Sequence, residues 1–164
     1  MKRIMFAALV LSLCGCYGKK PKTITGLEGK PMPAITLLAA DSSTIYNTAD
    51  IAPGKPTLLF SFETWCPYCK AQTKTLLSHI ESLKDVNIYM VCNTQFPEFK
   101  KFNKQYELYK YPGIKAGVDN NFSFAKYFKT GQIPYLAIYD RQKNLKQVLV
   151  GKTAISTIKD IALE

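Results

Sequence analysis

The chain has 164 residues, with 22 Lys or Arg against 12 Asp or Glu, which gives a formal charge of +10 at pH 7. This length fits one domain with enough core to fold unaided. Nearly all the cations are lysines dispersed along the sequence, without a nucleic-acid recognition motif, so we expect no nucleic-acid partner.

The N-terminus has the features of a bacterial export signal. A basic start, Met1-Lys2-Arg3, leads into an apolar run that is too short for a lasting membrane span. The following Leu13-Cys14-Gly15-Cys16 resembles the lipobox of bacterial lipoproteins, in which Cys16 would carry the lipid. We therefore predict a signal peptide at 1–15 and a lipidated tether at 16–28, with an ordinary secretory signal or a short anchor as alternatives.

Beyond the tether, strand-like and helix-like segments alternate. The segments 34–39 and 43–46 flank a polar turn and predict a short N-terminal hairpin. Other strands are expected from apolar runs, and helices from apolar residues at helical spacing. The expected strands are 56–62, 86–92, 114–118, 134–139 and 145–150, and the expected helices are 66–83, 97–110, 121–128 and 154–163. This order predicts an α/β sandwich with a mixed central sheet flanked by helices.

Two thiols lie where the expected strand 56–62 gives way to a helix. Cys66 and Cys69 are three positions apart, so the second lies about one turn further along the same helix face. A helix start favours negative charge, so Cys66 should be held partly as the reactive thiolate. We expect Cys66 to be the exposed thiol that attacks and Cys69 the shielded thiol that resolves the mixed disulfide.

Two other uses of this cysteine pair compete with redox chemistry. A closed zinc site needs four Cys or His ligands, and beyond the pair the chain has only His79, Cys14, Cys16 and Cys92. An inert disulfide in so small a ring would stabilise the fold little. Redox chemistry is favoured. Cys92, at the end of an apolar strand, is expected to be a buried thiol without a redox role.

The segments Gly29–Leu37, Thr64–Lys70 and Gly131–Leu136 are similar to the opening strand, active site and cis-proline loop of exported thioredoxins of the TlpA/ResA type. The resemblance covers 29–164 and implies a thioredoxin-like domain there. It also implies a cis peptide bond at Pro134, whose loop lies beside the cysteines and shapes a substrate groove. An extended substrate would then pair with the backbone at Ile133. An ordinary trans-proline at a strand edge is the alternative.

The chain departs from this family at its buried acid. Thioredoxins place an aspartate six residues before the first cysteine, where this chain has Phe60, and ResA-like proteins often place a glutamate six residues after it, where this chain has Gln72. Glu63 is the nearest carboxylate in sequence and either substitutes for that acid or faces solvent. The dipeptide Pro67-Tyr68 resembles that of glutaredoxins and is interpreted as tuning the redox potential.

These features predict a thiol–disulfide oxidoreductase of the bacterial cell envelope, anchored as a periplasm-facing lipoprotein. Trp65, Pro67 and Tyr68 would flank the reactive sulfur and contact protein substrates, and a membrane redox partner would renew the dithiol or disulfide. Beyond that redox-active disulfide no metal or organic cofactor is expected. Tyr17 stands where enteric lipoproteins of the inner membrane carry an aspartate, which favours the outer membrane. The resemblance favours reduction of protein disulfides.

Two rival functions belong to other classes. Peroxiredoxins share the thioredoxin fold, but they typically place a threonine three residues before their reactive cysteine, where this chain has Glu63. A lipoprotein could also use the fold as a non-catalytic binding or chaperone module. The intact pair Cys66 and Cys69 argues against that second alternative.

Overall fold

The computed structural model describes residues 23–164. The predicted signal peptide at 1–15 and the predicted lipidation site Cys16 lie outside the described residues. The described part of the predicted tether begins at Thr23, which forms an isolated antiparallel bridge with Val148. The chain is therefore in contact with the sheet from its first described residue.

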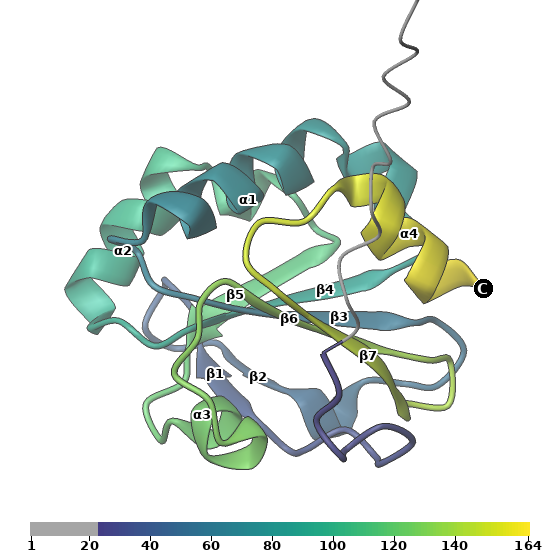
Figure 1. The fold of residues 1–164 in the computed structure, drawn as a ribbon. Helices are drawn as coiled ribbons and strands as arrows, with labels where there is room; N and C mark the ends of the chain where they lie inside the picture. Colours follow the sequence, from purple (N-terminus) through teal and green to yellow (C-terminus); the bar gives the residue numbers. More distant parts are fainter. Residues whose placement is uncertain (1–22) are drawn as a thin grey trace, which may run out of the picture.

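A seven-stranded mixed sheet forms the centre of the molecule, in the order β2-β1-β5-β4-β3-β6-β7 (Figure 1). The strands are β1 (Thr36–Leu38), β2 (Ile45–Asn47), β3 (Thr57–Phe62), β4 (Asn87–Cys92), β5 (Ile114–Val118), β6 (Tyr135–Tyr139) and β7 (Leu145–Val150). The three central strands β3, β4 and β5 are parallel, and the hairpins β1–β2 and β6–β7 add antiparallel strands on either side. The expected mixed sheet and N-terminal hairpin are confirmed.

Helices cover both faces of this sheet (Figure 1). They are α1 (Pro67–Ser78), α2 (Phe96–Gln105), α3 (Ser123–Phe128) and α4 (Ile155–Leu163). Figure 1 shows α1, α2 and α4 on one face and α3 on the other. Successive strand residues point to opposite faces, so Phe60 of β3 lies in the larger core and Leu59 lies in a second core with Phe124 of α3. β3 is consequently buried along its whole length.

Two helices are shorter than the sequence pattern predicts. The helix expected over 66–83 ends at Ser78, because His79 leaves helical geometry (φ −123°, ψ 21°) and only a 3-10 turn follows over Ile80–Leu83. The Ser78 hydroxyl donates to the Thr75 carbonyl oxygen (3.1 Å), a local bond of the kind that competes with helix continuation.

The helix expected over 97–110 also stops early. It ends at Gln105, because Glu107 adopts a left-handed backbone conformation (φ 49°) before the separate 3-10 turn Leu108–Lys110. Apolar residues continue at helical spacing through that turn, so the periodicity alone hides the interruption. The third helix begins at Ser123, two residues later than expected.

The N-terminal hairpin packs on β5 through a close backbone approach. Leu38 of β1 pairs with Val118. A Cβ atom at Gly117 would come within 2.8 Å of the Leu37 Cβ atom and of the Leu38 carbonyl oxygen. Only glycine fits without displacing β1, so this residue allows the hairpin to join the sheet.

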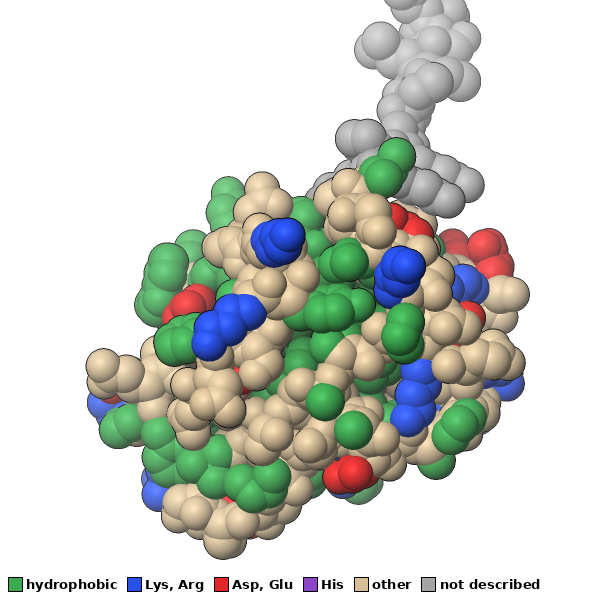
Figure 2. All heavy atoms as spheres, turned by 90° about the horizontal axis from the view of Figure 1, so that it is seen from below, with side chains coloured by type: hydrophobic (Ala, Val, Ile, Leu, Met, Phe, Trp, Pro, Cys, Tyr) green, Lys and Arg blue, Asp and Glu red, His purple; other side chains and the backbone are tan. Residues whose placement is uncertain are grey.

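Basic side chains are dispersed over the surface. Figure 2 shows one face of the molecule, on which the Lys and Arg side chains lie apart from one another among hydrophobic and uncharged ones. This agrees with the even spread of lysines in the sequence. Among residues 23–164, no helix is long and apolar enough to cross a membrane.

Candidate active site at the start of α1

A short loop after β3 places the two cysteines. Residues 63–65 connect the strand to Cys66, whose backbone N–H donates to the Glu63 carbonyl oxygen (3.2 Å). β3 is paired with β4 on one side and with β6 on the other, so the loop starts from a strand that is held on both edges. The position of Cys66 is thus set by the centre of the sheet.

Cys66 is the N-cap residue of α1. Its backbone is extended (φ −67°, ψ 118°), and its Sγ atom accepts the N–H of Cys69 (3.1 Å). Pro67 follows in the first helical turn, where its missing N–H costs nothing. The sulfur occupies the place that a Ser or Asp oxygen takes at other helix starts, where the helix dipole favours negative charge.

Cys66 is less exposed than we expected from the sequence. Only 4% of its surface is exposed, and Cys69 is completely buried. Both residues belong to the larger core, and Ile133 packs against that core from the loop before β6. The expectation of an exposed Cys66 is therefore wrong, because apolar neighbours enclose the helix start. Cys66 is nevertheless the more accessible thiol of the pair.

Burial raises the pKa of the Cys69 thiol far above its ordinary value. The neighbouring Cys66 sulfur raises this pKa further, while a hydrogen bond from the backbone of Glu63 acts in the opposite direction. The negative charge of the Glu63 side chain is a smaller contribution that also raises it. Cys69 therefore keeps its proton at neutral pH.

The loop before β6 lies next to the end of β3. The Ile133–Pro134 peptide bond is cis, as the resemblance implied. In the antiparallel pairing of β3 with β6, Ser61 lies opposite Tyr135, so Pro134 comes beside the last residue of β3. Ile133 packs against the core that contains both cysteines. The fold thus brings the two predicted parts of the site together, although they are more than sixty residues apart in the sequence.

Two exposed aromatic side chains flank the helix start. Trp65 is 67% exposed and Tyr68 is 66% exposed, which places them among the most exposed large hydrophobic residues of the described chain. Pro67 between them is exposed as well. An apolar surface of this kind next to a reactive group is suited to contact with another protein.

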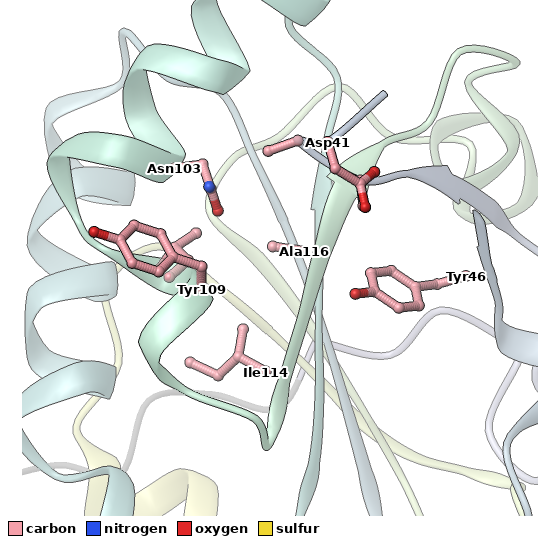
Figure 3. A pocket seen from close by; sticks show the side chains of 9 residues that line it. Asp41, Tyr46, Asn103, Tyr109, Ile114 and Ala116 are labelled. Carbon is pink, nitrogen blue, oxygen red and sulfur yellow. The ribbon is translucent and has the colours of Figure 1, made fainter. Parts of the chain in front are cut away.

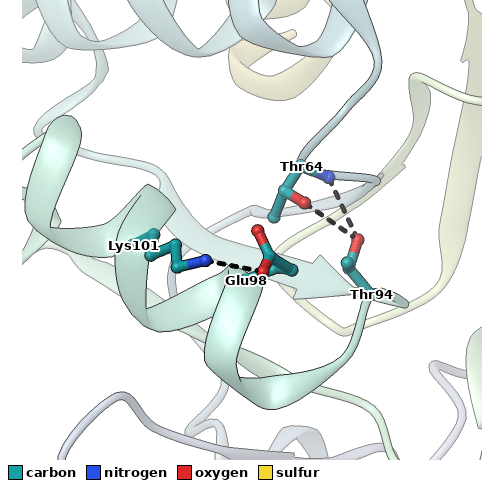
Figure 4. A network of polar contacts seen from close by, with 4 residues as sticks. All are labelled: Thr64, Thr94, Glu98 and Lys101. Carbon is teal, nitrogen blue, oxygen red and sulfur yellow. Dashed lines mark hydrogen bonds and ion pairs between the residues drawn. The ribbon is translucent and has the colours of Figure 1, made fainter.

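Glu63 and Thr94 form a polar network that we did not anticipate from the sequence. The Glu63 Oε2 atom accepts the Thr94 hydroxyl (2.7 Å) and the Trp65 indole N–H (3.2 Å). The Thr94 hydroxyl oxygen in turn accepts a hydrogen bond from the backbone N–H of Thr64 (3.0 Å), as drawn in Figure 4. Glu63 is half-buried, so it neither sits in the core nor points freely into solvent. No signal in the sequence links it to Thr94, which lies 31 residues away.

The positions of the family's buried acids hold uncharged residues that serve the core. Phe60 is fully buried. Gln72 is also fully buried, and its Oε1 atom accepts the backbone N–H of Thr153 (2.7 Å), which ties α1 to the segment before α4. Its Nε2 atom is a buried donor without a hydrogen-bond partner in the described chain. Gln72 therefore makes a structural hydrogen bond, and its amide cannot move a proton as an acid at this position would.

Cys92 ends β4 opposite Phe62 and is completely buried. Burial raises its pKa to about 11, although hydrogen bonds from the backbone and the side chain of Thr94 act in the opposite direction. It is a free thiol, as are Cys66 and Cys69. A thiol of such high pKa has little thiolate at neutral pH, which supports the interpretation of Cys92 as inert.

A closed zinc site would need a cluster of Cys or His ligands. Within residues 23–164 no group of three or more His, Cys, Asp or Glu side chains could hold a metal ion. His79 lies on the surface after α1, where its Nδ1 atom is 2.9 Å from the Ser78 hydroxyl and 3.0 Å from the Thr75 carbonyl oxygen. These are local contacts at a helix end.

A surface pocket of about 310 Å³, shown from close by in Figure 3, has no cysteine among its lining residues. The N-terminal hairpin lines one side of it, and α2 with the following turn lines the other. Its labelled residues are Asp41, Tyr46, Asn103, Tyr109, Ile114 and Ala116. Ile114 begins β5, whereas Cys66 follows the far end of β3, which runs in the same direction. None of the predicted site residues lines this pocket.

The chain belongs to the AhpC/TSA family, whose model matches residues 29–150. Among curated relatives, the thiol:disulfide interchange protein DsbE of Pasteurella multocida is 36% identical over 74 residues, which are 44% of this chain and 41% of that protein. The protein of the same name from Escherichia coli strain K12 is 37% identical over 73 residues, 43% of this chain and 40% of that one. The matched segment thus spans about two fifths of these relatives.

Solved structures share the fold at low sequence identity. The thioredoxin domain of a thiol-disulfide oxidoreductase from Bacteroides vulgatus superposes with a TM-score of 0.69 at 19% identity, covering 82% of this chain and 97% of that one. StoA from Bacillus subtilis superposes with a TM-score of 0.63 at 15% identity, covering 79% and 96%. The expected thioredoxin-like fold is therefore confirmed.

Proposed function

We propose that this protein is a thiol–disulfide oxidoreductase that acts on protein substrates through Cys66 and Cys69. The observation that carries this function is the asymmetry of the pair: the Cys66 sulfur caps α1 and accepts the Cys69 N–H, while Cys69 lies fully buried behind it. The Cys66 sulfur is thus placed to react with a partner, and the Cys69 sulfur is placed to react only with Cys66. The names of the DsbE relatives support the same chemistry.

In the reducing direction, the Cys66 thiolate attacks one sulfur of a substrate disulfide. A mixed disulfide forms, and the other substrate sulfur leaves as a thiolate that takes up a proton. Cys69 then gives up its proton and attacks the Cys66 sulfur, which releases the second substrate sulfur. Two electrons pass from the dithiol to the substrate, and the Cys66–Cys69 disulfide remains. The reverse sequence oxidises a substrate dithiol.

The substrate surface in this proposal consists of Trp65, Pro67 and Tyr68 on the cysteine side and of Ile133 and Pro134 on the other. The exposed aromatic rings would contact apolar residues next to the substrate disulfide. An extended substrate segment would pair with the backbone at Ile133. The cis bond and the register of β6 against β3 support this arrangement, since they bring the loop of Ile133 beside the helix start.

The cellular setting is also part of the proposal. The export signal at 1–15 and lipid attachment at Cys16 would anchor the domain in the bacterial cell envelope, facing the periplasm, with the outer membrane favoured. A membrane redox partner would renew the dithiol, because each substrate reduced leaves the disulfide behind. The sequence patterns of the N-terminus support this setting.

Replacement of Cys69 by Ser tests the catalytic assignment. The variant should still form mixed disulfides through Cys66 but should not release them, so substrates should accumulate as covalent adducts that mass spectrometry can identify. Cys66→Ser is the matched control and should capture nothing. Capture by Cys66→Ser but not by Cys69→Ser would reverse the two roles.

Two further measurements separate the rival functions. A peroxidase would turn over hydrogen peroxide faster than it exchanges with a dithiol. A binding or chaperone module would keep its activity when both cysteines are replaced by Ala. We expect dithiol exchange to exceed peroxide turnover and the double variant to be inactive.

A further inference from the structure

Glu63 forms hydrogen bonds with Cys66, Trp65 and Thr94. Its carbonyl oxygen accepts the Cys66 N–H, and its backbone also forms a hydrogen bond that lowers the pKa of Cys69. Its carboxylate accepts the Trp65 indole N–H and the Thr94 hydroxyl. The residue is therefore the point at which the loop after β3, the start of α1 and the segment after β4 meet.

Both side-chain bonds of Glu63 end on one atom. The Trp65 Nε1 atom lies 3.2 Å and the Thr94 Oγ1 atom lies 2.7 Å from the same Oε2 oxygen. Without this anchor, the Trp65 ring, which is 67% exposed, would have little to hold it beside Cys66. The carboxylate thus fixes an aromatic ring on the surface that the substrate would approach.

We propose that Glu63 is a positioning residue with two effects: its carboxylate fixes the Trp65 ring beside the dithiol, and its charge slows the step in which Cys69 displaces the bound substrate. The inference rests on the proposed function, because it concerns one step of thiol–disulfide exchange. It assigns the half-buried carboxylate a role as an electrostatic brake. A proton acceptor in the same place would have the opposite effect on the rate.

The brake follows from the place of Glu63 beside the cysteine pair. Its carbonyl oxygen lies 3.2 Å from the Cys66 nitrogen, and the Cys66 sulfur lies 3.1 Å from the Cys69 nitrogen. The titratable side chains that act on the Cys69 thiol in the described chain are Cys66, at the start of α1, and Glu63, in the loop before it. The same carboxylate also acts on Cys92 at the end of β4. A carboxylate opposes the formation of a second negative charge nearby, so it adds to the rise in pKa that burial causes.

The step affected is the release of the substrate from its mixed disulfide with Cys66. Cys69 loses a proton to solvent and its sulfur attacks the Cys66 sulfur of the mixed disulfide. The bond between Cys66 and the substrate breaks, and the substrate sulfur leaves with the electron pair. The rate depends on the fraction of Cys69 present as thiolate, so a charge that lowers this fraction slows release.

The test is a two-phase reaction of the reduced full chain with dithiobis(nitrobenzoate), followed by the colour of the released thiolate. The first phase reports attack by Cys66, and the second reports release by Cys69; Cys69→Ser should lack the second. In Glu63→Gln one amide oxygen can still accept both hydrogen bonds while the charge is gone. We expect its second phase near neutral pH to be about two- to threefold faster, with the pH profile displaced to lower pH.

Trp65 is the only tryptophan of the chain, so its fluorescence reports the anchor directly. Emission and anisotropy should match the wild type in Glu63→Gln. In Glu63→Ala, which loses both bonds, anisotropy should fall while the second phase is again faster. Glu98→Gln is the matched control: this exposed carboxylate on α2 is paired with Lys101 (2.9 Å; Figure 4), and its loss should change neither phase.

The outcomes separate the inference from the function on which it rests. Absence of the first phase in the wild type would contradict the proposed function itself. A normal first phase with an unchanged or slower second phase in Glu63→Gln would overturn the brake, and slower release would make Glu63 a proton acceptor. Unchanged Trp65 anisotropy in Glu63→Ala would overturn the anchor.

Discussion

At the scale of single residues, burial keeps two thiols of the described chain, Cys69 and Cys92, in the protonated form. Burial raises the pKa of Cys92 to about 11, and it raises that of Cys69 as well. A group of this pKa is ionised to only about one part in ten thousand at pH 7, and the fraction grows tenfold for each pH unit above that. Burial also keeps the alkylating reagent away from both sulfurs.

We therefore expect iodoacetamide to label Cys66 first in the reduced protein at pH 7. Labelling of Cys69 and Cys92 should be at least about tenfold slower and should accelerate as the pH is raised. Peptide mass spectrometry over a time course gives the order. Faster labelling of either buried thiol would contradict the assignment of Cys66 as the nucleophile.

Thr94 permits a second prediction at this scale. Its hydroxyl accepts the Thr64 N–H and donates to Glu63, so Thr94→Val should leave a half-buried donor without its partner. The expected loss in the free energy of unfolding is about 1–3 kcal/mol. Thr94→Ser keeps the hydroxyl and should cost less. Denaturant titration measures both, and equal losses for Val and Ser would mean that the methyl group matters more than the hydroxyl.

At the scale of elements, the attachment of the N-terminal hairpin depends on one glycine. A side chain at Gly117 would meet β1 at 2.8 Å, so Gly117→Val should displace the hairpin and cost at least about 1–3 kcal/mol in the free energy of unfolding. Gly113 is the matched control, because nothing lies within 4 Å of a Cβ atom there. Gly113→Ala should be close to neutral, and similar losses at both positions would refute the close-approach argument.

The strands could be predicted from the sequence because most of them follow from a short run of neighbouring apolar residues. β3 consists mainly of Leu and Phe residues, and its burial on both faces follows from that composition. The helix ends at His79 and Glu107 depend on single backbone conformations that hydrophobic periodicity does not encode. For the same reason, the periodicity predicted one long helix where the chain forms a helix and a turn.

The parts of the site that the sequence predicts, the cysteine pair and the cis-proline loop, are marked by motifs. The part that it does not predict, the network of Glu63 and Thr94, depends on a long-range contact. The pair Cys66 and Cys69 and the cis bond at Pro134 were both anticipated, because a spacing and a resemblance marked them. The bonds of Gln72 to Thr153 and of Glu63 to Thr94 join residues 81 and 31 positions apart. Only the folded structure brings such residues together.

At the scale of the whole molecule, the equilibrium between dithiol and disulfide sets the direction of electron flow. A reductant needs a comparatively stable disulfide, and an oxidant needs a stabilised thiolate. The resemblance of the sequence to TlpA/ResA-type proteins favours a reductant. We expect a potential of roughly −200 to −270 mV, on the scale that places strong oxidants near about −120 mV. Equilibration with glutathione buffers measures it, and a value near the oxidant end would reverse the direction.

The bridge between Thr23 and Val148 bears on solubility. β7 is the outermost strand of the sheet on its side, and a bare strand edge is a template for pairing with another chain. Thr23 and Pro31 form bridges with Val148 and Asn144 along this edge. The segment that contains Thr23 and Pro31 thus covers part of the exposed edge of β7. Removal of the chain before Met32 should leave the fold but promote self-association, seen as a rise in light scattering with protein concentration. A shortened protein that stays monomeric would show that the edge of β7 does not need to be covered to prevent self-association.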